Sequence, residues 1–168
     1  MDNENREEEV ANLLVRVYEI HEAIIIETGG LPGLREATLL HSAVARPFAA
    51  FGGEELYPTE FEKAGALFHS LIKSHPFMDG TKRTALGAAL FFLERSGHSV
   101  PDELPLNTVI EFCVSTAEEN LRQAQGEAIT PRTVPEIADW FRRLLGASPP
   151  VLEGGRNKER PNEEERHG

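Results

Sequence analysis

The side chains that could do chemistry are concentrated in nine consecutive residues near the middle of the chain, His75-Pro76-Phe77-Met78-Asp79-Gly80-Thr81-Lys82-Arg83. His75 has the one side chain whose unperturbed pKa suits a general base near neutral pH. Asp79 is the only carboxylate in this segment, and a carboxylate beside phosphate-binding groups is how proteins usually hold Mg²⁺. Lys82 and Arg83 bind phosphate well, Lys as a point charge and Arg through two parallel N–H groups. The segment therefore predicts a site for a phosphate-bearing ligand and a metal ion.

The backbone of the same segment predicts an anion site at the start of a helix. Pro76 disfavours helical geometry at the residue before it, so the preceding helix should end there. Gly80 can take a backbone conformation closed to other residues, and a new helix should begin near Thr81. The first amides of a helix have no partners within it, and together with the helix dipole they bind anions. Cations are unfavourable in a first helical turn, so their presence indicates that an anion is expected. The predicted phosphate-binding residues are Gly80, Thr81, Lys82 and Arg83.

Each of these residues also has an ordinary structural explanation. His75 could cap or pack a helix end, Asp79 before Gly80 could form a turn, and the two cations could be surface charges. A P-loop is excluded because no glycine stands five residues before Gly80 and no strand is predicted there. A zinc-type centre is excluded, since the sequence has no His-Glu-x-x-His pattern and Cys113 is its only cysteine. Cys113 lies in an apolar run and is predicted to be a small core residue.

Apolar residues repeat at intervals of three and four in six segments, which predicts about six helices. The repeats run over 13–25, 39–44, 61–72, 86–93, 106–114 and 134–145. Of these helices, the very apolar one that ends at Gly97 is predicted to be central. Residues 47–58 contain Gly52-Gly53 and two prolines, which favours an irregular loop or one short hairpin near 50–58. No segment shows sustained strand alternation, so the predicted fold class is all-α.

Length and composition indicate one globular domain followed by a polar tail. We expect the domain over 1–146 and a disordered tail over 147–168, where Pro, Gly and mixed charge replace the apolar periodicity. The formal net charge of −11 argues against direct binding of nucleic acid, which rewards clustered Lys and Arg. The longest apolar run, 88–93, is far shorter than the roughly 20 residues of a membrane span, and the N-terminus is acidic where a signal peptide is basic. These features predict a cytoplasmic protein that does not enter a membrane.

The segment from His75 to Leu86 resembles the signature of the Fic/Doc superfamily, in which His-x-Phe-x-Asp/Glu-Gly/Ala-Asn-Lys/Gly-Arg precedes a helix. Lys82 resembles the death-on-curing (Doc) branch, because the adenylylating Fic branch usually has Gly at that position. The likeness covers residues 10–146 and includes Gly29-Gly30-Leu31-Pro32-Gly33 and the helices over 85–97 and 134–145. It implies a compact helical bundle around a central apolar helix, with residues 48–58 as a flap that aligns the target.

The resemblance also implies the chemistry of the site. His75 would take a proton from a protein hydroxyl, Asp79 would hold Mg²⁺, and the amides after Gly80 would bind the phosphates of ATP together with Lys82 and Arg83. Doc toxins transfer the γ-phosphate, and the target they imply is a Thr of elongation factor Tu, so that translation stops. They pair with a Phd-type antitoxin whose C-terminal segment folds into a groove of the toxin. The resemblance therefore implies a toxin kinase whose catalytic residues are His75, Asp79 and Arg83.

Thr81 departs from the family pattern, which has Asn at this position. Asn offers a donor and an acceptor on one planar group whereas Thr offers one shorter hydroxyl, so we expect slower transfer. Transfer of AMP stays open as an alternative, although Lys82 argues against it by filling space that Gly leaves for the nucleotide. A catalytically silent binding module is the other alternative. Thr81 favours this module, whereas the retained His75, Asp79, Lys82 and Arg83 argue against it.

A second pattern, Ser115-Thr116-Ala117-Glu118-Glu119-Asn120, fits the [Ser/Thr]-x-x-x-Glu-[Gly/Asn] motif by which some Fic proteins inhibit themselves. In that arrangement the Glu pairs with the motif Arg and blocks phosphate binding, so Glu119 would pair with Arg83. The pattern is short and loose, and an exposed helix end is the alternative explanation. The sequence leaves both interpretations open.

Overall fold

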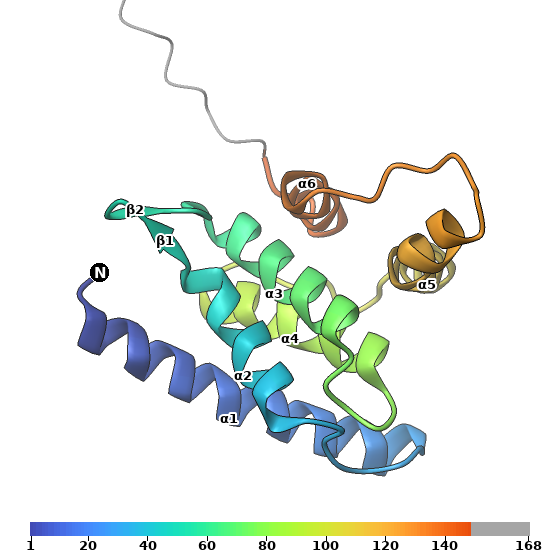
Figure 1. Ribbon diagram of the computed structural model, residues 1–168, viewed down its shortest axis with the longest axis horizontal. Helices are drawn as coiled ribbons and strands as arrows, with labels where there is room; N and C mark the ends of the chain where they lie inside the picture. The colour runs from blue at the N-terminus through green and yellow to red at the C-terminus, as the bar shows by residue number, and fades with distance from the viewer. Residues whose placement is uncertain (149–168) are drawn as a thin grey trace, which may run out of the picture.

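Six α-helices dominate the part of the chain that the structure, a computed structural model, describes, residues 1–148 (Figure 1). In chain order the elements are α1 (Asn3–Thr28), α2 (Ala37–Ala45), the 3₁₀ turn η1 (Arg46–Phe48), β1 (Ala50–Phe51), β2 (Glu54–Glu55), α3 (Glu60–Ser74), α4 (Thr81–Arg95), α5 (Leu106–Ala124) and α6 (Val134–Leu144). The predicted all-α fold with about six helices and one small hairpin is confirmed. From residue 149 on, the polar tail predicted over 147–168 lies outside the described residues. None of the helices described is long and apolar enough to span a membrane.

Helix α3 lies in the middle of the bundle and packs against α2, α4, α5 and α6 (Figure 1). A capping box fixes its N-terminus: Thr59 Oγ1 accepts from the Glu62 amide at 3.2 Å, and the Glu62 carboxylate accepts from the Thr59 amide at 3.0 Å. Apolar residues cover most of its circumference, and its buried residues are Phe61, Ala64, Gly65, Ala66, Leu67, Phe68, Leu71 and Ile72. A helix buried on nearly all sides cannot shift easily, so its C-terminal end is a fixed platform for the residues that follow.

Helix α4 is the apolar helix that was predicted to be central, and it packs against α1, α3 and α5. Ala85, Ala88 and Ala89 of α4 have no exposed surface, and such small side chains allow the neighbouring helices to approach closely. Gly87 serves the same purpose toward α1, since a Cβ at this position would lie 3.1 Å from Ile20 Cγ2. Because α1 and α3 both hold α4, the first turn of α4 is fixed relative to the end of α3.

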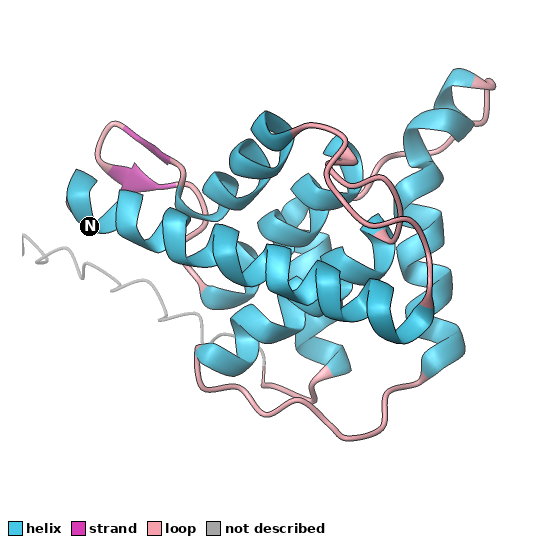
Figure 2. Cartoon of the chain, turned by 90° about the horizontal axis from the view of Figure 1, so that it is seen from below, coloured by secondary structure: helices cyan, strands magenta, loops and turns pink. Residues whose placement is uncertain are grey.

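The short hairpin of β1 and β2 is antiparallel, with Ala50 opposite Glu55. Gly52 and Gly53 form its two-residue turn with φ of 60° and 85°, values that glycine adopts without strain. The hairpin, magenta in Figure 2, leads into the N-terminus of α3, whereas residues 75–83, here called the motif loop, follow the C-terminus of that helix (Figure 1). Helix α3 has 15 residues and rises about 1.5 Å per residue, so its hairpin end and its motif-loop end lie about 22 Å apart. The predicted hairpin is present, but the structure does not bring residues 48–58 to the motif loop.

Candidate functional site

His75 ends α3 in a strained backbone conformation. It has φ 49° and ψ 59°, and within residues 1–148 no other non-glycine residue has a positive φ. The left-handed region costs a non-glycine residue about 1–2 kcal/mol, and Pro76 then prevents the helix from continuing. The imidazole is exposed. Partial burial, and then the charges of Lys82 and Arg35, lower the pKa of His75 below its ordinary value of 6.5. The ring is therefore neutral near pH 7, the state that a general base requires.

The glycine-rich connection after α1 supports the motif loop from one side. Leu34 pairs with Phe77 as an isolated β-bridge, the Met78 amide donates to the Gly33 carbonyl at 3.0 Å, and the Arg35 amide donates to the Pro76 carbonyl at 2.8 Å. These contacts hold the motif loop against a segment roughly 45 residues earlier in the chain, as the pairing of Leu34 with Phe77 shows. Phe77 is 3% exposed and anchors the loop in the core.

Asp79 lies at the turn of the loop with both carboxylate oxygens oriented by backbone amides. Oδ1 accepts from the Gly80 amide at 2.7 Å and Oδ2 from the Leu31 amide at 3.2 Å. The approach of the Gly30 backbone is close, because a Cβ there would lie 2.6 Å from Asp79 Oδ2. The two amides, with a smaller contribution from Arg83, lower the pKa of Asp79 below its ordinary value, so the carboxylate is ionised.

The surroundings of Asp79 suit magnesium held jointly with a phosphate ligand. Its side chain is 45% exposed, so the remaining lone pairs of its oxygens can be reached. The described residues contain no group of three or more His, Cys, Asp or Glu side chains that could hold a metal alone. Mg²⁺ is usually bound through one or two carboxylates together with waters and substrate phosphates. One oriented, ionised carboxylate beside an anion site fits that pattern.

The first turn of α4 forms the other wall of the site. Its N-cap is Gly80 in the left-handed region, φ 70°, and no side chain caps the amides that follow. Residues of this turn and of the motif loop line a cavity of about 300 Å³: His75, Phe77, Met78, Asp79, Gly80, Thr81, Lys82 and Arg83. Uncapped amides at a helix start bind anions. The structure therefore brings all the residues predicted for the site into the lining of one cavity.

The two cations of this turn are placed differently. Lys82 is exposed at the cavity. Arg83 instead turns toward the end of α1, where its guanidinium donates to Thr28 Oγ1 and, at 3.1 Å, to the Gly29 carbonyl. Its second terminal nitrogen lies 3.6 Å from Asp79 Oδ1. Arg83 thus braces the loop against α1, and only part of its donor set faces the cavity.

Thr81, which departs from the Asn of the family signature, also lines the cavity. Its side chain belongs to the lining but is only 5% exposed. Arg35 was missed in the sequence: its guanidinium donates to the Ser74 carbonyl at 3.0 Å, at the end of α3. In the sequence, a basic residue just after a glycine-rich turn is only a weak sign of a functional site. Arg35 comes to lie near His75 because the connection after α1 pairs with the motif loop, far away in the chain.

Comparison with known proteins agrees with this geometry. A family model described as Fic/DOC family matches residues 14–93. The chain is 46% identical over 98 residues to Toxin Doc of Mycolicibacterium smegmatis (strain ATCC 700084 / mc(2)155), covering 58% of this chain and 69% of that protein. It is 33% identical over 129 residues to Protein kinase doc of Escherichia phage P1, covering 77% of this chain and 90% of the phage protein. The chain belongs to the Fic/DOC family. The matched residues of the Fic/DOC model include α3, the whole motif loop and most of α4.

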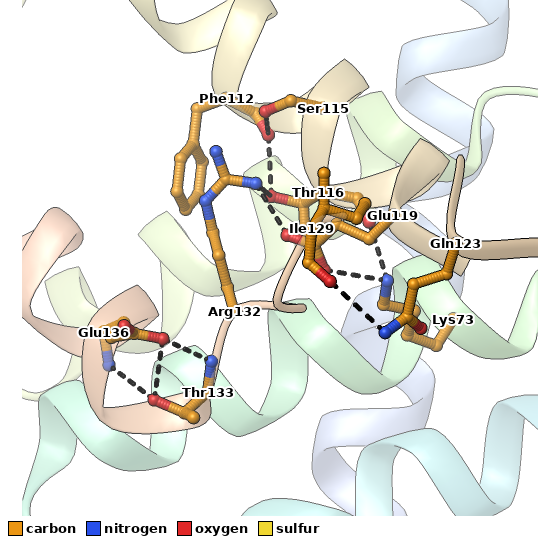
Figure 3. A network of polar contacts seen from close by, with 10 residues as sticks. All are labelled: Lys73, Phe112, Ser115, Thr116, Glu119, Gln123, Ile129, Arg132, Thr133 and Glu136. Carbon is orange, nitrogen blue, oxygen red and sulfur yellow. Dashed lines mark hydrogen bonds and ion pairs between the residues drawn. The ribbon is translucent and has the colours of Figure 1, made fainter. Parts of the chain in front are cut away.

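The glutamate of the self-inhibition pattern does not reach the Fic/DOC motif loop. Glu119 is 3% exposed and lies between two other cations: Oε2 is 3.1 Å from Lys73 Nζ, and Oε1 is 2.7 Å from Arg132 Nη1 (Figure 3). Arg83 has its partners at the end of α1 and in Asp79. The self-inhibiting Glu119–Arg83 pair, one of the two interpretations that the sequence left open, is therefore absent from this structure. Glu119 of α5 instead joins α3 and the segment before α6. Its burial also excludes the alternative explanation, an exposed helix end.

Proposed function

We propose that this chain is a Doc-like toxin that transfers the γ-phosphate of ATP to a protein hydroxyl, with elongation factor Tu as the target. The observation that carries the proposal is the single cavity that combines exposed His75, ionised Asp79 and the uncapped amides of α4 beside Lys82. The names of the two relatives, a toxin and a protein kinase, support it. Elongation factor Tu works in the cytoplasm, so the proposal places the chain there as well.

In this reaction His75 accepts the proton of the target hydroxyl. The hydroxyl oxygen forms a bond to the γ-phosphorus, the bond from that phosphorus to the bridging oxygen breaks, and ADP leaves with the electron pair. Asp79 would hold Mg²⁺, which when bound reduces the negative charge of the phosphates. The amides at the start of α4 and the Lys82 ammonium hold phosphate oxygens in place. Positioning and charge stabilisation of this kind provide most of the catalysis in phosphoryl transfer.

Labelled ATP distinguishes this reaction from AMP transfer. The purified chain is incubated with elongation factor Tu and ATP labelled at either the γ or the α phosphate. Label from the γ position on the target supports the proposal, and label from the α position supports the Fic-type alternative. His75→Gln is the matched control, because it removes the base and leaves Asp79 and the α4 amides in place.

A catalytically silent binding module is the second candidate, and one observation favours it. The Arg83 guanidinium is already engaged by Thr28 and Gly29, and Thr81 is nearly buried, so fewer side chains face the phosphates than the motif suggests. Calorimetry of ATP binding with Mg²⁺ and with EDTA, together with the labelled-ATP assay, separates the two. An enzyme of the proposed kind binds ATP more tightly with Mg²⁺, and Asp79→Asn removes the difference. A module that binds nucleotide without transferring label supports the second candidate.

The partner in the proposed system is a Phd-type antitoxin. The C-terminal segment of the antitoxin would bind the apolar cavity of about 670 Å³ between α1 and α2. Part of the lining of this cavity is Leu14, Val15, Tyr18, Leu34, Leu40 and His41. The net charge of −11 suits a basic segment around the apolar contact. Val15→Glu should abolish binding of a Phd-type antitoxin, since Val15 is 54% exposed in the cavity wall. Ile26→Glu, on the same helix but outside that cavity, is the control and should leave binding intact.

A further inference from the structure

His21 of α1 lies beneath the motif loop and contacts the chain on both sides of Asp79. Its side chain is 1% exposed. The ring stacks on Phe77 with centroids 3.9 Å apart and an interplanar angle of 12°. Its Nδ1 lies 3.1 Å from Oγ1 of Thr84, which is fully buried in the first turn of α4. The His21 side chain thus connects Phe77, two residues before Asp79, with the first turn of α4 at the cavity.

The chemistry of His21 is unfavourable for a residue that only fills the core. Its Nε2 is buried and has no hydrogen-bond partner in the described part of the chain. An unsatisfied polar atom in the interior lowers stability, and an apolar side chain of similar size would avoid this cost. Local violations of this kind are expected where function requires them. The stacking on Phe77 and the bond to Thr84 are what a histidine provides here and an aliphatic residue does not.

The charge state of His21 is consistent with these contacts. Burial lowers its pKa below 6.5, the facing charge of Arg83 lowers it further, and Glu22 and Asp79 act in the opposite direction. The ring is therefore neutral at pH 7 and carries one N–H. Either Nδ1 donates to the Thr84 hydroxyl or the hydroxyl donates to Nδ1, and both arrangements hold the two groups together.

We propose that His21 is a positioning residue for the phosphate site. By holding Phe77 and the first turn of α4 at a fixed separation, it sets the Asp79 carboxylate and the α4 amides at the distance that the phosphates of ATP require. The inference rests on the proposed phosphate transfer for its kinetic consequences, but the order of the loop can be measured without transfer. A misplacement of about 1 Å in such a site can reduce the rate about 100-fold, so the loss of one contact is measurable.

Two substitutions separate the contacts of His21. His21→Phe keeps a ring that can stack on Phe77 and removes both the bond to Thr84 and the unsatisfied Nε2. His21→Asn keeps a polar atom near the position of Nδ1 and removes the stacking ring. His21→Phe also leaves the buried Thr84 hydroxyl without this partner, which offsets the gain from removing Nε2, so we expect a Tm close to that of the unmodified chain. We expect its kcat to be at least about tenfold lower, with KM for ATP within about threefold. We expect His21→Asn to have a lower Tm but a higher kcat than His21→Phe.

The opposite ranking of Tm and kcat is the result that a merely structural role would not give. If kcat instead follows Tm across the two variants, or if His21→Phe transfers phosphate at the rate of the unmodified chain, the positioning role is wrong. His98→Phe is the matched control. His98 also contacts a phenylalanine, with the ring centroid of Phe61 4.5 Å away, but Phe61 lies in the first turn of α3, far from the motif loop. This control should leave kcat unchanged.

Amide hydrogen exchange of the motif loop keeps the inference testable if the unmodified chain transfers nothing. In that case the proposed function fails, while the positioning role still predicts faster exchange at residues 80–83 in both His21 variants and unchanged exchange in α6. Equal exchange at residues 80–83 in the unmodified chain and the variants overturns the positioning role whatever the transfer assay gives.

Discussion

Replacement of Glu119 by Ala is expected to lower the stability of the chain by about 3 kcal/mol. The Glu119 side chain is 4% exposed and is paired with Lys73, 17% exposed, and Arg132, 34% exposed. Removal of one member of a buried ion pair usually costs about 3–5 kcal/mol, because the partner charge stays desolvated. The low end applies here. Both cations have some access to water, and each keeps a second acceptor in Thr116: Lys73 at the carbonyl, 2.8 Å, and Arg132 at the hydroxyl, 3.3 Å.

The matched substitutions make the estimate specific. Glu119→Gln keeps an acceptor oxygen and loses only the charge, so we expect about half the effect, about 1.5 kcal/mol. Glu127→Ala breaks the Arg122–Glu127 pair, whose atoms are 2.7 Å apart but whose side chains are 40% and 45% exposed. Solvent screens exposed pairs of this kind, so this control should hardly change stability.

Thermal unfolding followed by circular dichroism measures all three variants. A change of 1 kcal/mol moves Tm by about 2–4 °C in a chain of this size, so we expect a fall of about 6–12 °C for Glu119→Ala and about 3–6 °C for Glu119→Gln. If Glu119→Ala lowers Tm no more than Glu127→Ala does, the ion pairs of Glu119 with Lys73 and Arg132 do not hold α3, α5 and the segment before α6 together. If its phosphate transfer instead rises several-fold below Tm, Glu119 inhibits the site and the structural role assigned to it is wrong.

Three further predictions concern the motif loop. Asp79→Asn should reduce γ-phosphate transfer by about 100-fold or more and make ATP affinity insensitive to EDTA, because the carboxylate is the group expected to hold Mg²⁺; calorimetry that still shows a Mg²⁺ dependence would contradict this. Thr81→Asn should raise kcat with little change in Tm, and equal rates would refute the expected weakening by Thr81. The acid limb of kcat/KM should have its midpoint below pH 6.5, because the pKa of His75 is lowered and the base is lost when it is protonated. A midpoint above 6.5 would contradict this assignment.

The predicted helices were confirmed where the signals are local, and the residues predicted for the site lie together at one cavity. Pro76 and Gly80 determine where one helix stops and the next begins, and these effects act within one or two residues. The apolar intervals of three and four likewise depend only on helical geometry. For this reason the nine-residue segment could be predicted as one unit from the sequence.

The sequence was uninformative where a contact joins residues far apart in the chain. Lys73 and Glu119 are separated by 46 residues, and Thr28 and Arg83 by 55. No local pattern indicates that Arg83 turns to α1, or that a glutamate with a suitable motif is buried beside other cations. The hairpin is a similar case: Gly52-Gly53 predicts the turn, but its distance from His75 depends on which end of α3 each segment joins.

These long-range contacts give α1 a role that its sequence did not suggest. His75 and the α4 amides belong to α3 and α4, which pack tightly on each other, so those two helices alone would fix the ends of the motif loop. They do not fix its middle. Asp79 is oriented by the Leu31 amide just after α1, Arg83 is held by Thr28 and Gly29 at the end of α1, and Phe77 is supported by a ring from the interior of the same helix. The geometry of the carboxylate therefore depends on how α1 lies against α4, and a substitution at that helix contact should change transfer even though it touches neither ATP nor target.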